Sequence, residues 1–93
     1  MAQIEVSRTE QDPSATRFHV RLTDDDGSAT EHDVTATSAD LDRLASGYPN
    51  PEMFIHACFE FLLERERKES ILRRFDIRQI ATYFPEFERG IGR

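Results

Sequence analysis

Three histidines are the residues of this chain best suited to hold a metal ion. His19 and His32 fall on two alternating segments that we expect to pair as a hairpin, where odd- and even-numbered side chains face opposite sides. His19 should face outward and His32 should lie on the core face or its edge, so the two cannot easily share an ion. His56 precedes Glu60 by one helical turn, but a metal site needs three or four ligands and no third is apparent nearby. We therefore predict no metal site.

Cys58 could act as a nucleophile with His56 as its base. Two residues apart on a helix, however, their side chains point about 200° apart and cannot pair within one chain. Cys58 also lies among apolar residues, where a thiol packs as a small hydrophobe and the thiolate is disfavoured. We predict a core cysteine, no catalytic residue, no cofactor and no enzymatic activity.

An acidic triplet at residues 24–26 precedes Gly27 at an expected turn. A calcium-binding loop would need further alternating oxygen ligands and a distal bidentate glutamate, which the sequence lacks. Turn formation by the aspartate side chains is the simpler interpretation.

Basic residues gather between positions 65 and 78 and give this segment a net charge of +3, although Glu66 and Glu69 are interleaved with them. An amphipathic helix here could present them to phosphate groups. The alternative function is therefore a small regulatory nucleic-acid-binding protein. Its expected phosphate contacts are Arg65, Arg67, Lys68, Arg73, Arg74 and Arg78.

The composition indicates one small domain with an uneven charge distribution. The chain has 93 residues and a net charge of −6, all of which arises in residues 1–50, and this acidity argues against nonspecific nucleic-acid binding. A single cysteine excludes an intrachain disulfide, as expected in a reducing compartment. The start of the chain shows no secretory signal, and its apolar run is too short to cross a bilayer. We expect a cytoplasmic protein with no membrane partner.

The first part of the chain alternates as β-strands do. Residues 3–7, 17–23 and 30–37 each place apolar or β-branched side chains at every second position. Asp26-Gly27 between the last two segments indicates a hairpin. Whether residues 3–7 pair within the chain or with a neighbouring copy stays open.

The register of the hairpin follows from its apolar face. Val20 should lie opposite Val34, which also places Arg21 opposite Asp33 as an opposite-charge pair. This register leaves a loop of about three residues centred on Gly27, or a wider one if the strand ends fray.

The rest of the chain is predicted to be helical. Ser38 should cap a short helix over residues 39–45, and Asn50 should open a long helix that runs to about Arg67. Apolar residues at 71, 72 and 75 then predict a second helical stretch from about residue 70.

A capping box predicts one more short helix near the end of the chain. Asp76-x-x-Gln79 resembles such a box, and Pro85 should end the helix that it opens. The tail keeps Phe87 and Ile91, through which it should dock on the core.

The long helix is apolar around most of its surface. Nine of the eleven residues from 53 to 63 are apolar, and one polar stripe interrupts them, formed by Glu52, His56, Glu60 and Glu64. Because so short a chain has little material with which to cover this helix, we expect a homo-oligomer, most simply a dimer, or a complex with another protein. The expected interface comprises Met53, Phe54, Cys58, Phe59, Phe61 and Leu62.

Three strings in the second half are distinctive: FEFLLERE from Phe59, ESILRRFDI from Glu69 and YFPEFE from Tyr83. Through them, residues 50–91 resemble a family of small bacterial proteins of uncharacterised function. The resemblance implies a bacterial cytoplasmic origin. It brings no established activity and no catalytic residue.

The sequence thus predicts one α+β domain over residues 1–93. A small antiparallel sheet, either a hairpin or a three-stranded meander, should occupy residues 3–37. Three to four helices in residues 38–91 should cover one face of it. The favoured function is a non-enzymatic protein-interaction module that self-associates through the apolar helix.

Overall fold

The computed structural model describes residues 2–91, with Ile91 described by its backbone alone. The predicted docking of the Ile91 side chain therefore lies outside the described part. None of the helices within residues 2–91 has the length and apolarity that crossing a bilayer requires.

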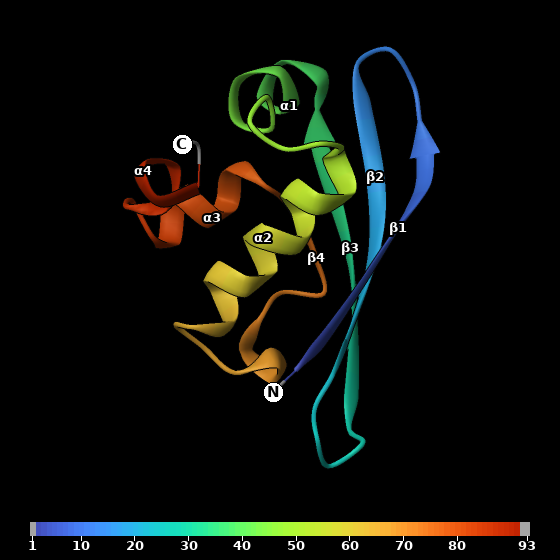
Figure 1. Ribbon diagram of the computed structural model, residues 1–93, viewed down its shortest axis with the longest axis vertical. Coiled ribbons are helices and arrows are strands. Elements are labelled where there is room, and N and C mark those ends of the chain that lie inside the picture. Colours follow the sequence, from blue (N-terminus) through green and yellow to red (C-terminus); the bar gives the residue numbers. More distant parts are fainter. Residues whose placement is uncertain (1, 92–93) are drawn as a thin grey trace.

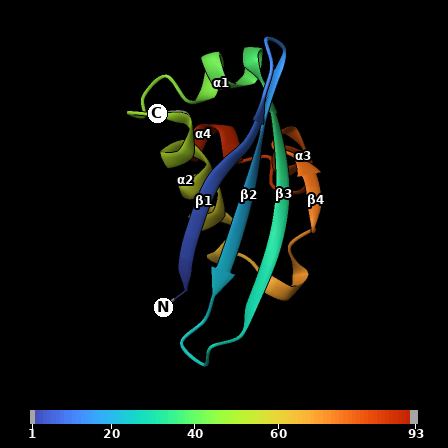
Figure 2. The same ribbon diagram turned by 90° about the vertical axis from the view of Figure 1, so that its right-hand side faces the viewer.

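Four strands form one sheet in the order β1-β2-β3-β4 (Figure 2). β1 (Gln3–Gln11), β2 (Ala15–Thr23) and β3 (Ala29–Thr37) make an antiparallel meander, and the short β4 (Arg74–Asp76) runs parallel to β3. The helices cover one face of this sheet and leave the other open (Figure 1). The predicted α+β class and the meander are confirmed, whereas β4 was not predicted.

The register of the β2–β3 hairpin differs from the prediction by two residues. Val20 lies opposite His32, and Arg21 lies opposite Glu31 rather than Asp33. A shift of two residues keeps every side chain on its predicted face, because the side-chain period of a strand is two. The apolar pattern therefore specified the faces of the hairpin correctly but not its register.

The loop of this hairpin explains the shift. It spans residues 24–28, where the Asp24 N–H donates to the Ser28 carbonyl and the Gly27 N–H donates to the Asp24 carbonyl, both at 2.9 Å. Gly27 has φ 85°, a conformation that glycine adopts without strain. The Asp26 carboxylate accepts from the Ser28 N–H and hydroxyl at 2.9 and 2.6 Å. These bonds produce the wider of the two predicted loops, but the loop is centred on Asp26 rather than on Gly27.

β1 is longer than residues 3–7 and pairs with β2 of the same chain, with a register shift between Arg8 and Glu10 that marks a bulge. Ile4 and Val6 pack against the core, as their alternation predicted. β1 forms one edge of the sheet, and β4 forms the other.

Side chains cap the first two helices. The Thr37 hydroxyl accepts from the Asp40 N–H at 3.1 Å and caps α1 (Ser38–Leu44), so the predicted cap at Ser38 is one residue too late. Asn50 caps α2 (Pro51–Leu63) as predicted, accepting from the Met53 N–H at 2.9 Å. α2 ends four residues before the predicted Arg67, because the chain tightens into a turn in which the N–H groups of residues 65 and 66 both donate to the Leu62 carbonyl.

The prediction of a second helical stretch from about residue 70 is wrong. Residues 68–70 form one 3₁₀ turn, η1 (Lys68–Ser70), and the chain then extends into β4. A spacing of four residues, as between Ile71 and Phe75, fits one face of a helix and one face of a strand equally well. The buried His32 ring, which contacts the Leu72 carbonyl at 2.7 Å through Nδ1, holds the extended conformation against the sheet.

The capping box at Asp76 is confirmed in outline. The Gln79 side chain accepts from the Asp76 N–H, and the Asp76 carboxylate accepts from the Arg78 N–H, both at 2.9 Å. These bonds begin α3 (Arg78–Tyr83), and α4 (Phe87–Ile91) follows after Pro85.

α2 lies at the centre of one hydrophobic core. The sheet covers one side of the helix, and the chain from Ile71 to Phe87 covers another. The short chain therefore does wrap its most apolar helix.

Candidate functional site

The predicted interface on α2 lies almost entirely inside the molecule. Of its six residues only Met53 is exposed, at 51%; the other five, Phe54, Cys58, Phe59, Phe61 and Leu62, are between 0% and 8% exposed. The Phe59 ring lies 5.6 Å from the His32 ring and 5.9 Å from the Phe75 ring. This burial removes the argument on which self-association through these residues was predicted.

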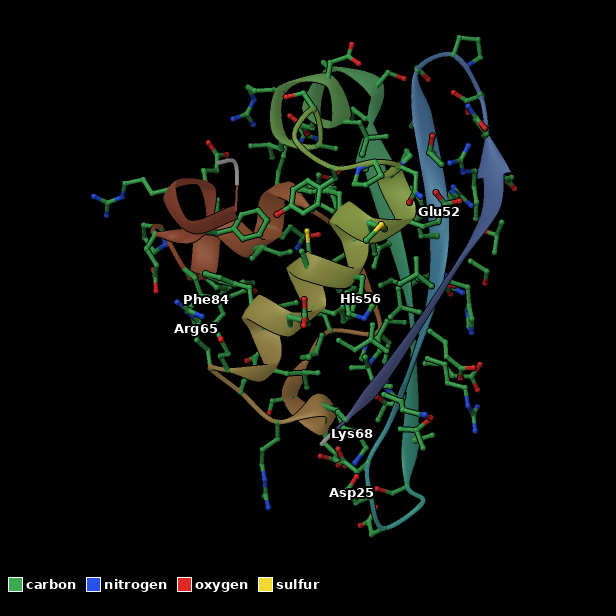
Figure 3. All side chains as sticks on the ribbon, in the orientation of Figure 1. Asp25, Glu52, His56, Arg65, Lys68 and Phe84 are labelled. Atoms are coloured by element: carbon green, nitrogen blue, oxygen red, sulfur yellow. The ribbon has the colours of Figure 1, made fainter. Side chains whose placement is uncertain are left out.

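Lys68, one of the six predicted phosphate contacts, is only 3% exposed. Its ammonium donates to the carboxylates of Asp24 and Glu69 at 2.5 and 2.6 Å and to the Ser28 hydroxyl at 2.8 Å. Figure 3 shows it next to the hairpin loop that carries Asp25. The two carboxylates, Asp24 first, raise the pKa of Lys68, and Lys68 lowers the pKa of Glu69. Its charge is therefore neutralised within the fold.

Two further arginines of the predicted phosphate set also have partners. The Arg65 guanidinium lies 3.6 Å above the Phe61 ring and donates to the Phe61 carbonyl at 3.0 Å and to Glu86 at 3.3 Å. Arg78 lies 3.3 Å from the Asp76 carboxylate and 3.5 Å from Asp40. Both side chains act as links between elements.

The remaining three members of that set are exposed. Within residues 2–91, Arg67 and Arg73 form no ion pair, and Arg74 is 88% exposed with Asp33 at 3.9 Å. The amphipathic helix that was expected to align them is absent, because residues 71–73 are not helical and residues 74–76 form β4.

The two histidines of the hairpin lie on opposite faces of the sheet, as their parity predicted. His32 is 1% exposed, and its ring contacts the Leu72 carbonyl through Nδ1 at 2.7 Å and the Thr30 hydroxyl through Nε2 at 2.8 Å. Burial lowers the pKa of His32. A neutral ring satisfies both bonds, by donating to the carbonyl and accepting from the hydroxyl.

His19 lies on the open face between two carboxylates. Its Nδ1 is 3.2 Å from Asp33 and its Nε2 is 2.7 Å from Glu31. Hydrogen bonds to Asp33 and then to Glu31 raise the pKa of His19. Because opposite ring nitrogens contact the two carboxylates, the three side chains cannot converge on one ion.

The remaining candidate residues for chemistry are Cys58, His56 and Glu60. Burial raises the pKa of the Cys58 thiol, which is fully enclosed. His56 and Glu60 lie 3.4 Å apart on the exposed side of α2. Among the residues that the structure describes, no group of three or more histidine, cysteine or acidic side chains could hold a metal ion.

The feature that the sequence analysis missed is an open apolar groove of about 380 Å³. It lies between the end of α2, the segment leading into β4, and α3. Leu72 and Tyr83 are 44% and 64% exposed there, and they are two of the three large apolar side chains exposed within residues 2–91. The apolar lining consists of Leu62, Ile71, Leu72, Phe75, Ile80, Tyr83 and Phe84.

Packed aromatic rings fix the walls of this groove. Phe75 packs on Phe59 beneath one wall, and Phe84 packs edge-on against Phe61 at 6.0 Å beneath the other. Figure 3 shows Phe84 beside Arg65 at this end of the molecule. The groove is therefore formed by rigid elements before anything binds it.

A sequence signal for the groove existed in the adjacent pair Ile71 and Leu72. On a helix both could face inward, but in an extended segment such as the one that begins at Ile71 neighbouring side chains point to opposite sides, so one must leave the core. Ile71 is buried at 3% exposure, and Leu72 is the one that emerges.

Comparisons with known proteins do not identify a ligand for the groove. No protein-family profile, curated protein or solved structure matches this chain. The resemblance of residues 50–91 to a bacterial family stays a prediction.

Proposed function

We propose that this chain is a non-enzymatic protein-interaction module that binds apolar side chains of a partner in the groove between β4 and α3. The observation that carries the proposal is the groove itself, an open, preformed depression with seven apolar lining residues, of which Leu72 and Tyr83 are exposed. Exposed apolar surface gathered in one place is characteristic of interaction sites.

The size of the groove favours a short anchoring segment. Its volume of about 380 Å³ lies at the lower end of the range of ligand pockets, roughly 300–1,000 Å³. A stable protein interface buries about 800 Å² on each partner, which needs a much larger surface. We therefore propose that one or two large apolar side chains of a partner enter the groove.

The anchoring segment is proposed to be helical. An added strand would have to pair with β4, but β4 has only three residues and the Asp76 N–H is already bonded to the Gln79 side chain. An amphipathic helix needs no backbone bond from its receptor and presents side chains at i and i+3 or i+4 to a groove.

Self-association through α2 is the less favoured form of this proposal. Five of the six residues expected to mediate it are buried in the same chain. Nucleic-acid binding is also less favoured, because Arg65, Lys68 and Arg78 are occupied by partners within the fold.

Matched variants of the groove test the proposal. Leu72→Asp and Tyr83→Asp place a charge in the groove, and Thr82→Asp places the same charge on α3 outside it. In a nuclease-treated pull-down, we expect each groove variant to bind the partner of the wild-type protein about ten- to a hundredfold more weakly, since a buried apolar anchor contributes roughly 1.5–3 kcal/mol. Thr82→Asp should retain it fully. Equal retention by all three variants would exclude the groove as the binding site.

A further inference from the structure

The edge strand β1 and the flank of α2 form a second surface, separate from the groove between β4 and α3. β1 pairs with β2 on one side, and no strand among the described residues pairs with its other side. Alternate N–H and C=O groups along such an edge point away from the sheet. Figure 2 shows α2 behind the sheet at this edge, projecting past β1. A strand added here would therefore find both a backbone partner and a helix to pack on.

A depression of about 610 Å³ lies where the added strand would run. Ile4 of β1 and Leu63 of α2 line it, and both are only partly buried. These two side chains offer an apolar floor to the inward-facing residues of an added strand. The bulge between Arg8 and Glu10 limits regular pairing to the part of β1 that precedes it.

The charges around this depression define its partner. Glu5, Glu60 and Glu64 line it, and His56 lies 3.4 Å from Glu60. The Glu60 and Glu64 side chains are 62% and 74% exposed. At the other end of the polar stripe, Arg8 binds both carboxylate oxygens of Glu52 at 3.1 and 2.8 Å, so that end is already neutralised. Beside the first residues of β1, Glu64 shares the single guanidinium of Arg65 with Glu86, and Glu60 contacts the imidazole of His56, so negative charge is in excess there.

The same charges disfavour a second copy of the chain. Two-fold antiparallel pairing of β1 with itself would place both α2 helices on the same side of a continuous sheet. Their acidic flanks would then face each other, and like charges in an interface oppose association. A partner segment with lysine or arginine at alternate positions would instead be attracted to this acidic flank.

We propose that the β1 edge and the acidic flank of α2 bind an extended, basic segment of another protein by strand addition. Backbone hydrogen bonds to β1 supply affinity, and the basic side chains that point toward α2 select the segment through Glu60 and Glu64. Because these carboxylates are exposed, the affinity falls as salt is added.

A defined peptide tests this proposal without knowledge of the natural partner. The probe is a fluorescein-labelled Lys-Val-Lys-Val-Lys-Val peptide with blocked ends, followed by anisotropy at low salt. We expect saturable binding, with backbone amide shifts in ¹⁵N spectra confined to β1 and the flank of α2. A peptide with glutamate in place of lysine should not bind, and neither should one whose valine amides are N-methylated. Absence of binding by the basic peptide, or equal binding by the N-methylated peptide, would overturn the proposal.

Two charge-matched variants of the full chain complete the test. Glu60→Gln with Glu64→Gln removes two carboxylates from the flank. Glu10→Gln with Asp42→Asn removes two exposed carboxylates outside the site, since Glu10 lies on β1 beyond the bulge and Asp42 lies on α1. The flank variant should weaken binding about three- to tenfold, as expected for two solvent-exposed ion pairs, while the second variant binds normally. If both variants bind the peptide equally weakly, the peptide is attracted by the net charge of the protein alone, which would contradict the proposed site. Leu72→Asp should leave this binding unchanged, which separates the β1 edge from the groove proposed above.

Discussion

Single residues of the central hairpin show how one sequence pattern creates two opposite electrostatic environments. His19 and His32 lie on the same hairpin but on opposite faces of the sheet. Carboxylates raise the pKa of His19, and burial lowers the pKa of His32. The parity of their positions predicted the faces, but their partners could not be predicted, because Asp33, Glu31 and the Leu72 carbonyl depend on a register and a strand that the sequence did not reveal.

His32 should make the fold sensitive to acid. Its pKa in the folded state lies below the ordinary 6.5, so the unfolded chain takes up the proton first as the pH falls. The free energy of unfolding should therefore fall as the pH drops below 6.5 and through the folded pKa. His32→Gln removes this titration and should flatten the pH dependence below pH 6.5, measured by urea unfolding. If the free energy of unfolding of the variant depends on pH as steeply as that of the wild type, another group causes the acid sensitivity.

His19 should act in the opposite direction. Its folded pKa lies above 6.5, so its contribution to stability is complete below 6.5 and is lost as the pH rises through the folded pKa. His19→Gln should remove this loss from urea unfolding curves recorded above pH 6.5. If wild type and variant lose the same stability over that interval, the contacts of His19 with Glu31 and Asp33 do not stabilise the fold.

Among the elements, α2 was predicted most fully and its role was misjudged. Its cap at Asn50, its apolar surface and its central position follow directly from the sequence. That the same chain would cover it could not be foreseen, because the covering segment had been assigned to the wrong structure. The spacing of Ile71 and Phe75 fits a helix and a strand alike, and only the presence of β3 as a parallel neighbour decides between them.

Replacing side chains of α2 with alanine tests whether the helix serves the core or an interface. Phe59 is fully buried, so Phe59→Ala should reduce the free energy of unfolding by about 3–5 kcal/mol. Met53→Ala should change it by less than about 0.5 kcal/mol. Denaturant unfolding of both variants measures this difference. A small effect at Phe59 together with a change in molar mass would instead support the interface predicted from the sequence.

The capping box should contribute measurably to α3. Gln79→Ala leaves the Asp76 N–H without its side-chain acceptor and should cost about 1 kcal/mol, as the loss of a helix cap does. Thr82→Ala on the same helix is the control and should stay within about 0.5 kcal/mol. If the two substitutions have the same effect on the urea midpoint, the bond between Gln79 and Asp76 does not stabilise the helix.

At the scale of the whole molecule, helices on a single face leave two distinct places for partners. One is the apolar groove beside β4, and the other is the acidic edge along β1. The sequence predicted the α+β class and the meander because alternation and caps are local signals. Neither surface could be predicted, because each combines residues that the fold brings together from distant parts of the chain, as Leu62 with Tyr83 or Glu5 with Glu60.

A photoreactive benzoylphenylalanine in place of Tyr83 tests the groove as a protein-binding site most directly. The same group at Thr82, one residue away and outside the groove, is the control. We predict a discrete crosslinked partner from position 83, lost when Leu72→Asp is added, and no such product from position 82. Equal products from both positions, or none from position 83 while the variant remains folded, would contradict the proposal that this protein functions through the groove.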